Sequence, residues 1–536
     1  MIASYEGSEA MKALVLGGVG QFTVVDGDKC TPSDLGENYA ITEENVRSCA
    51  SRASAVTQSL LTLNDNVSGS FVEDNLPNIL STRQEFFQDF TLVIATQLRD
   101  CEAKTLDTIC RDFNVKVVFV RSYGMVGFIR ASVKEHCIVE SKPDHLPDDL
   151  RLSDPWPELL AYAASFQLES VCGTTSTGPA SVTMDDMTFK HIPYVVILLH
   201  CLDMWKRTHS GSHPSSSSDL KEFKACIKQM SRTGDEENIK EAVGASHKVL
   251  VSKTSTVSSI PKEVNAVLND PSAMSLNAAT STDFWIIVSA VREFVYGSSN
   301  SENENIETTT KGTGHLPLEG SLPDMTSFTE YYLSLQEIYQ NKAMTDAKEV
   351  HTIVKRKLGE IGRESDSISI NDVKHICKHA RCLNVIRHVS LIDEMEASEQ
   401  KGGKIQLLLE DESTSSCTLF YLLLRAVDRA YNSLNRYPGE FDQELEDDIC
   451  SVRMAAMSIL SEYGLTQSLN LSLTLLDDYV KEVCRYGGAE LHVISAIMGG
   501  IAAQESLKLI LAQYTPIFCT YVFDAVHMLG TSIDLT

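Results

Sequence analysis

The sequence predicts an α/β protein in which a mainly parallel sheet is interrupted by a large, mostly helical insert. Short apolar runs alternate with helical stretches from Phe22 to about Ser132. Leucine and charged residues then recur at helical spacing from about Ser153 to Leu473, and strand character returns at Thr520. Because 536 residues exceed the usual size of one compact domain, we expect more than one unit.

The strands and helices of the first part follow from its hydrophobic pattern. Helical stretches are expected over Glu9–Leu16 and Thr42–Leu63, where apolar positions recur at helical spacing. Strands separated by helical segments favour a covered and mainly parallel sheet. The expected strands, which are short and rich in β-branched residues, are Phe22–Val25, Val67–Val72, Phe90–Ala95, Val115–Val120 and Val126–Val133.

The rest of the chain divides into an insert and a return to the first fold. Residues 1–152 are predicted to form the first α/β part, 153–474 the helical insert, and 475–536 the second α/β part. Within the last part, Ala489–Leu511 reads as a buried helix rich in small residues, and Thr520–Phe523 reads as a strand.

Composition excludes several classes of protein. Acidic residues outnumber basic residues by 73 to 46, so the formal net charge is −27. We therefore expect no nucleic-acid partner and no docking to anionic membranes, since both need clustered Lys and Arg. No stretch approaches the roughly 18 apolar residues of a membrane span, and the first residues do not resemble a secretory signal. The 14 cysteines form no Cys-x-x-Cys pair, so we expect reduced thiols in the cytoplasm or nucleus and no structural zinc.

Two polar groups near the start invite a nucleotide interpretation. A dinucleotide fingerprint needs a strand before its glycines and a helix after them. Gly17–Gly20 has the reverse order, so a helix-to-strand turn is the better interpretation. Asp26 and Asp28 follow an expected strand and could bind a ribose hydroxyl, although an ordinary polar loop explains them equally well.

Catalytic and metal-binding motifs are sparse. The sequence has no nucleophile elbow, no P-loop and no His-Glu-x-x-His, and no cysteine carries a recognisable local signature. We therefore assign no catalytic residue and no metal site. His375 and His379 share a helical face and could ligate a metal, but without a third ligand a solvated helix face is favoured.

Two segments resemble contact surfaces. Tyr332, Leu335 and Tyr339 form a stripe along one expected helix, and such a stripe either anchors a partner or faces the core of its own chain. The pattern does not separate these two interpretations. His191 begins a rigid turn before the apolar run Val195–Leu199, which the pattern alone makes structural.

Several segments resemble the ubiquitin-activating-enzyme superfamily. The similarity is carried by Leu14–Asp26, Val67–Glu73 and Thr91–Gln97, and later by motifs such as Leu322–Met325 and Arg425–Arg429. Within the superfamily these residues resemble the regulatory subunits of the heterodimeric enzymes that activate the Nedd/Rub modifier of cullins. This family is also described as the amyloid-precursor-protein-binding or auxin-resistance type.

The resemblance implies a Rossmann-like, ThiF-type adenylation half-domain and a non-catalytic role. The insert is then similar to a catalytic-cysteine half-domain that lacks the cysteine. ATP, magnesium, zinc and the catalytic cysteine are expected on the partner, a catalytic subunit that adenylates the ubiquitin-like modifier and carries it as a thioester. Gly36–Ala40 departs from the Asn-x-x-Arg-Gln run of ATP-competent relatives. Cys49–Arg52 lacks the phosphate-facing lysine of those relatives.

The same resemblance assigns contacts with the catalytic subunit. They are His191, Asp324, Met325, Tyr332, Leu333, Leu335 and Gln336. These assignments come from the family and turn the tyrosine stripe into an expected interface.

The resemblance also implies an arginine-rich segment and a first strand before this sequence begins. We expect that the start is missing or that this copy is impaired, and that the chain is poorly soluble without its partner. Two other functions stay open at this stage. One is an autonomous adenylate-forming enzyme with Asp26 and Asp28 near the nucleotide, and the other is an interaction scaffold with no role in activation.

Overall fold

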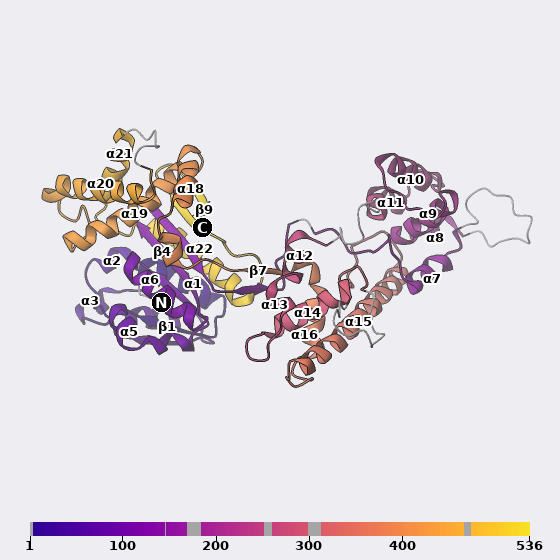
Figure 1. Ribbon diagram of the computed structural model, residues 1–536, viewed down its shortest axis with the longest axis horizontal. Helices are drawn as coiled ribbons and strands as arrows, with labels where there is room; N and C mark the ends of the chain where they lie inside the picture. The colour runs from indigo at the N-terminus through magenta and orange to yellow at the C-terminus, as the bar shows by residue number, and fades with distance from the viewer. Residues whose placement is uncertain are drawn as a thin grey trace, which may run out of the picture. The chain divides into compact units, whose positions relative to one another are not determined.

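A computed structural model describes residues 4–144, 146–168, 184–250, 260–297, 312–465 and 473–535. The chain forms two compact units (Figure 1). The first unit combines Met1–Ile138 with Val385–Thr536, and the second unit is Val139–Asn384. The α/β class with a helical insert is confirmed by this arrangement.

The first unit contains nearly all the strands and two groups of helices. Its N-terminal elements are α1 (Tyr5–Leu16), β1 (Gln21–Val25), α2 (Asp34–Glu37), α3 (Glu43–Arg47), α4 (Arg52–Leu61), β2 (Ser68–Val72), α5 (Leu76–Thr82), the 3-10 helix η1 (Gln84–Asp89), β3 (Leu92–Thr96), α6 (Asp100–Asp112), β4 (Lys116–Tyr123), β5 (Val126–Ser132) and β6 (His136–Ile138). Its C-terminal elements are β7 (Asn384–Ile386), α17 (Leu391–Met395), α18 (Glu399–Glu410), α19 (Ser415–Leu434), η6 (Asp442–Glu444), α20 (Leu445–Glu462), α21 (Leu473–Cys484), α22 (His492–Leu511), β8 (Thr520–Asp524) and β9 (Leu529–Ile533).

The strands pair in both directions. β1 pairs with β2 and β3 pairs with β4 in parallel, as expected where a helix connects two strands. In the sheet of order β3-β4-β5-β8-β9, the pairs after β3-β4 are antiparallel. Gly124, in the left-handed region at φ 56°, allows the tight turn from β4 into β5. The sheet is therefore mixed. The expected helix over Thr42–Leu63 is broken into α3 and α4, with Cys49 between them at φ 50°.

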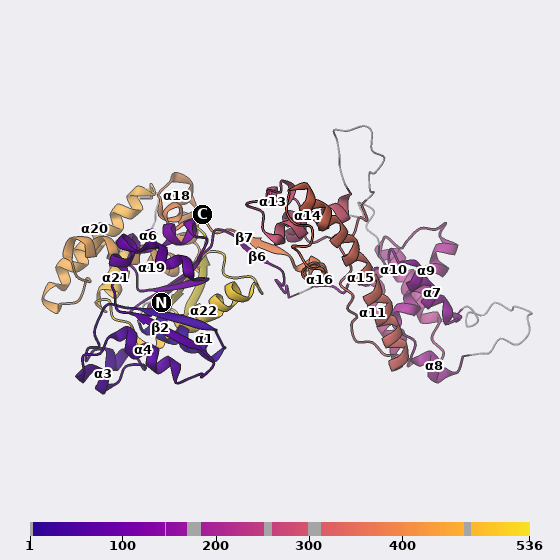
Figure 2. The ribbon, with the colours of Figure 1, turned by 90° about the horizontal axis from the view of Figure 1, so that it is seen from below.

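Alternate residues of the central strands face two different cores. In β4, Val118 and Val120 pack with α1, α4 and α22, whereas Val117 and Phe119 pack with α5 and α6. α1 and α22 lie side by side on one face of the sheet, as Figure 2 shows. α22 is also the one helix in the described part of the chain that is long and apolar enough to cross a membrane, but half of it is buried in this core.

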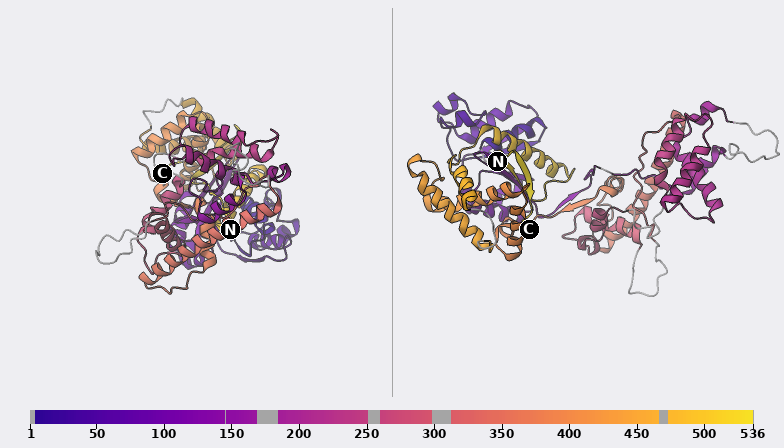
Figure 3. Two further views of the ribbon diagram at one scale, coloured as in Figure 1. Left: turned by 90° about the vertical axis from the view of Figure 1, so that its right-hand side faces the viewer. Right: turned by 90° about the horizontal axis from the view of Figure 1, so that it is seen from above.

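The described residues of the second unit are built almost wholly from helices (Figure 3). They are α7 (Pro157–Ser165), α8 (Asp186–Lys190), α9 (Tyr194–Thr208), α10 (Ser217–Gln229), α11 (Glu237–Ala245), η3 (Ser246–Val249), α12 (Lys262–Leu268), α13 (Pro271–Met274), α14 (Asp283–Tyr296), α15 (Thr329–Glu360), α16 (Ile370–Lys378) and η5 (Ala380–Cys382). The apolar helix α9 is the centre of one core, which includes the first turns of α15. The remainder of α15 packs against α14 and α16.

The insert ends earlier than the sequence predicted. The prediction placed its limits at 153 and 474, whereas the second unit spans Val139–Asn384. Helices α17 to α21 belong to the first unit because their apolar faces share a core with the sheet. Phe420 and Leu423 of α19, for example, cluster with Val126 and Val522 of the strands.

Candidate functional site

Most of the residues predicted to contact a partner gather at the N-terminal end of α15. Asp324 and Met325 lie in the loop before the helix, and Tyr332, Leu333 and Gln336 lie on its first turns. His191 comes from a distant part of the sequence and closes α8. The structure therefore brings together two segments that only the family resemblance had connected.

His191 is held against the start of α15 by its ring and by its backbone. Its imidazole stacks on Phe328, with ring centroids 4.4 Å apart and an angle of 7° between the planes. The amide of Phe328 donates a hydrogen bond of 3.2 Å to the carbonyl of His191. Nδ1 lies 2.8 Å from the carbonyl oxygen of Met187, which can only accept, so Nδ1 carries a proton.

Side-chain hydrogen bonds anchor the loop that carries Asp324 and Met325. The amide and hydroxyl of Thr326 donate to the carboxylate of Glu241, at 3.0 and 2.7 Å. The hydroxyl of Tyr332 donates to the carbonyl of Leu322, at 3.3 Å. Neither Phe328 nor Glu241 could be identified from the sequence, because a single aromatic residue and a single acid carry no spacing signal.

The residues at the start of α15 include some that face the core of the chain and some that are exposed. Leu335 and Tyr339 are fully buried, and the hydroxyl of Tyr339 donates to the carbonyl of Leu150 at 2.7 Å. Leu333, in contrast, is 56% exposed. The expectation that Leu335 lies on a contact surface is therefore wrong for this unit, since its side chain fills the core beneath that surface. We call the remaining six predicted residues the α15 surface: His191, Asp324, Met325, Tyr332, Leu333 and Gln336.

A second cluster surrounds Asp26 and Asp28 at the end of β1. Arg52, at the start of α4, forms ion pairs with Asp26 at 3.3 Å, Asp34 at 3.3 Å and Asp28 at 3.5 Å. The amide of Asp28 donates to Oδ1 of Asp26 at 2.8 Å. We call these four side chains the carboxylate pocket. Both oxygens of Asp26 already have partners within it.

The electrostatics of the carboxylate pocket do not suit a nucleotide's phosphates. Burial raises the pKa of Asp26, although the charge of Arg52 opposes the shift. One guanidinium is shared among three carboxylates, so an added phosphate would face net negative charge. Gly17–Gly20 joins α1 to β1, which confirms a helix-to-strand turn and supplies no helix N-terminus for an anion.

The described cysteines lack the surroundings of a nucleophile. Burial raises the pKa of Cys110, Cys377 and Cys484 to about 12, which keeps these thiols protonated at neutral pH. Three described cysteines are exposed, namely Cys49, Cys101 and Cys450. Every shift resolved for a described thiol is upward, whereas an activated thiol needs a lowered pKa.

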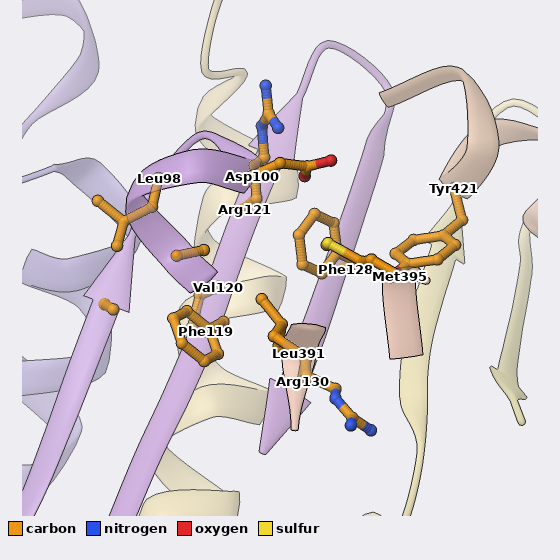
Figure 4. Close-up of a pocket in the computed structure, with 12 residues that line it drawn as sticks. Leu98, Asp100, Phe119, Val120, Arg121, Phe128, Arg130, Leu391, Met395 and Tyr421 are labelled. Atoms are coloured by element: carbon orange, nitrogen blue, oxygen red, sulfur yellow. The ribbon is translucent and has the colours of Figure 1, made fainter. Parts of the chain in front are cut away.

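Buried ion pairs also connect helices of the first unit to its sheet. Arg121 of β4 makes two hydrogen bonds with Asp428 of α19, at 2.8 and 2.9 Å. Arg130 of β5 pairs with Glu394 of α17 at 2.6 Å. Figure 4 shows Arg121 and Arg130 at opposite ends of a cavity lined by apolar side chains between them. The cavity measures about 20 Å³, room for a single water molecule, so it is a packing feature and too small for a nucleotide.

Comparison with known proteins gives close matches over nearly the whole chain. The ThiF family model matches residues 6–534. The NEDD8-activating enzyme E1 regulatory subunit AXR1 of Arabidopsis thaliana is 42% identical over 97% of this chain and 89% of its own length. The NEDD8-activating enzyme E1 regulatory subunit AXL, also of Arabidopsis thaliana, is 40% identical over 99% of this chain and 93% of its own length. The Xenopus laevis regulatory subunit is 35% identical over 99% and 93% of the two chains.

Proposed function

The chain belongs to the ThiF family and, within it, to the NEDD8-activating enzyme E1 regulatory subunits, and we propose that it is the non-catalytic half of a heterodimer. The single observation that carries this proposal is the 42% identity to a regulatory subunit over 97% of the chain. The catalytic subunit then supplies the chemistry, and this chain supplies a surface and a scaffold.

Two features of the first unit support a non-catalytic role. Arg52 is engaged by the acids of the carboxylate pocket, so the group nearest to Asp26 is not available for the phosphates of ATP. The buried thiols of Cys110 and Cys484 are held protonated, so they are poor acceptors for a thioester. We therefore place adenylation and thioester formation on the partner, together with ATP, magnesium and zinc.

The composition of the α15 surface supports the proposal that the catalytic subunit docks there. It combines an exposed leucine, a tyrosine and a histidine–phenylalanine stack on a rigid helix end. Aromatic and apolar anchors of this kind dominate the binding energy of protein interfaces. We propose that Leu333 and Tyr332 are the main anchors, and that His191 and Asp324 contribute polar contacts around them.

The remaining partners follow from the same proposal. The ubiquitin-like modifier of cullins is the substrate of the assembled enzyme, and the chain works in the cytoplasm, the nucleus or both. The net charge of −27 supports the absence of nucleic-acid and anionic-membrane partners.

Reconstitution of the enzyme tests this function. The catalytic subunit, the modifier and ATP are mixed with and without this chain, and modifier thioester on the catalytic subunit is followed on non-reducing gels. We expect thioester formation to depend on this chain. As a control, the triple variant Cys49→Ser, Cys101→Ser, Cys450→Ser should support the same rate as the unmodified chain.

Two results would contradict the proposal. An unchanged thioester yield when this chain is left out would remove its regulatory role and favour an interaction scaffold. ATP–pyrophosphate exchange by this chain alone, lost in Asp26→Asn, would favour an autonomous adenylating enzyme.

A further inference from the structure

We propose that Glu140, His375 and His379 form a Zn²⁺ site that ties together the two chain segments at which the second unit begins and ends. The sequence presented the two histidines without a third ligand, and the structure brings a carboxylate to them from a distant segment. Glu140 follows β6, and the histidines lie on α16 and at its C-cap (Figure 2 labels both elements).

The three ligand groups converge on one point. Nε2 of His379 lies 3.5 Å and Nε2 of His375 lies 4.0 Å from Oε1 of Glu140. One ligand atom from each of the three residues lies within 4.8 Å of the others. Bonds of about 2.1 Å to a tetrahedral zinc separate neighbouring ligand atoms by about 3.4 Å, so small side-chain adjustments would complete the site.

The fold fixes this convergence. Ser369 caps the N-terminus of α16 in a reciprocal capping box with Asp372. Val373, Ile376 and Cys377 bury the inner face of the same helix, which sets its rotation and turns the histidines toward Glu140. The Glu140 and His379 side chains are only 16% and 22% exposed, so two of the three ligands are already restrained.

The neighbouring charges leave the ligand atoms available. Lys142 pairs with the other carboxylate oxygen of Glu140, Oε2, at 3.5 Å, and so leaves Oε1 facing the two imidazoles. The separations of 3.5 and 4.0 Å are longer than an ordinary hydrogen bond, and the two contacts are ion pairs only when the histidines are protonated. Lys378 and Glu319 are the other charged groups that act on His379.

The chemistry of the ligand set favours zinc. Two imidazole nitrogens and one carboxylate form a His₂Glu set, which suits Zn²⁺ and leaves one tetrahedral position for water. Hard cations such as Mg²⁺ and Ca²⁺ prefer oxygen ligands and are disfavoured by the two imidazoles.

The position of the site indicates what a bound ion would do. Glu140 lies where the chain enters the second unit, and His379 lies close to Asn384, where it leaves. The amide of Ser141 already donates to the carbonyl of Cys382 at 3.3 Å, so the two segments are neighbours. A metal ion would add a strong link between them and close the loop formed by the whole unit, which stabilises the folded state.

The test uses the full chain after removal of metal by chelator and dialysis. Zn²⁺ is titrated by calorimetry, and thermal unfolding is recorded with and without ZnCl₂. We expect one saturable site per chain, a higher unfolding midpoint with zinc, and visible absorption typical of tetrahedral coordination when Co²⁺ replaces Zn²⁺.

Variants separate this site from incidental zinc binding. His375→Ala removes a half-exposed side chain, so the protein should fold normally and bind Zn²⁺ at least about 10-fold more weakly, as should Glu140→Gln. His247→Ala, an exposed histidine elsewhere in the second unit, is the matched control and should bind as the unmodified chain does. The proposal is overturned if no saturable site is found, or if His375→Ala and Glu140→Gln bind zinc as tightly as the control.

Discussion

The carboxylate pocket of the first unit and the α15 surface of the second unit use their side chains in opposite ways. In the pocket, Arg52 and three aspartates satisfy one another, and Asp26 is almost wholly buried. On the α15 surface, Leu333 is an apolar side chain that is 56% exposed. The charges around Asp26 are therefore compensated within the first unit, whereas an apolar side chain of the second unit is left exposed. A regulatory subunit needs the second property more than the first.

Among the predicted substitutions, Asp428→Ala should cause the largest loss of stability, because it breaks a buried ion pair of the first unit. This substitution leaves Arg121 buried without its bidentate partner, and we expect a loss of about 3–5 kcal/mol in the free energy of unfolding. Urea unfolding of the variant measures the loss. Arg47→Ala is the control, because its pair with Glu43 is exposed and should contribute no more than about 0.5 kcal/mol. Equal effects of the two substitutions would refute the buried network.

Two leucines that lie two residues apart test the division of α15 into a buried face and an exposed face. Leu335→Ala opens a cavity in the core and should cost about 2–5 kcal/mol of unfolding free energy. Leu333→Ala should change it by less than about 0.5 kcal/mol. Thermal unfolding of the two variants decides the assignment, which fails if Leu333→Ala proves the more destabilising.

The smallest expected effect is a pH dependence of the first unit. Burial, followed by the charge of Asp428, raises the pKa of Asp100 to about 6. The folded state therefore holds this proton more tightly than the unfolded state, so its contribution to stability is present at low pH and is lost as pH rises through about 6. Because Asp100 is partly exposed, we expect the effect to be about 1 kcal/mol.

Asp100→Asn isolates that contribution from the other carboxylates. The free energy of unfolding of the variant minus that of the unmodified chain should be larger, and so more stabilising, at pH 7.5 than at pH 5. Denaturant titrations at the two pH values measure the difference. A relative stability that does not vary with pH would show that Asp100 is an ordinary surface carboxyl.

Apolar patterning predicted most strands and the long C-terminal helix. Val115–Val120 and Val126–Val133 became β4 and β5 because β-branched runs next to a glycine turn specify a hairpin locally. The end of the insert was missed, since α19 has the same helical period as the insert helices and the period does not reveal which core a helix faces. Leu335, by contrast, was assigned to the interface by the family resemblance, because its helical pattern alone left both interpretations open.

The candidate sites also combine residues that are close in the sequence with residues that only the fold brings together. The spacing of His375 and His379 was visible in the sequence, but Glu140 reaches them only through the fold. His191 and Phe328 are likewise joined by tertiary packing. No local pattern encodes either pair, and only the family resemblance connected the six residues of the α15 surface.

If this chain acts through the α15 surface, its binding to the catalytic subunit must depend on that surface. The dissociation constant is measured for the unmodified chain, Leu333→Asp and Leu407→Asp, which places the same charge on an exposed leucine of the first unit. We expect Leu333→Asp to weaken binding at least about 10-fold, or 1.4 kcal/mol, and Leu407→Asp to bind normally. Unchanged affinity for Leu333→Asp in a normally folded protein would contradict it.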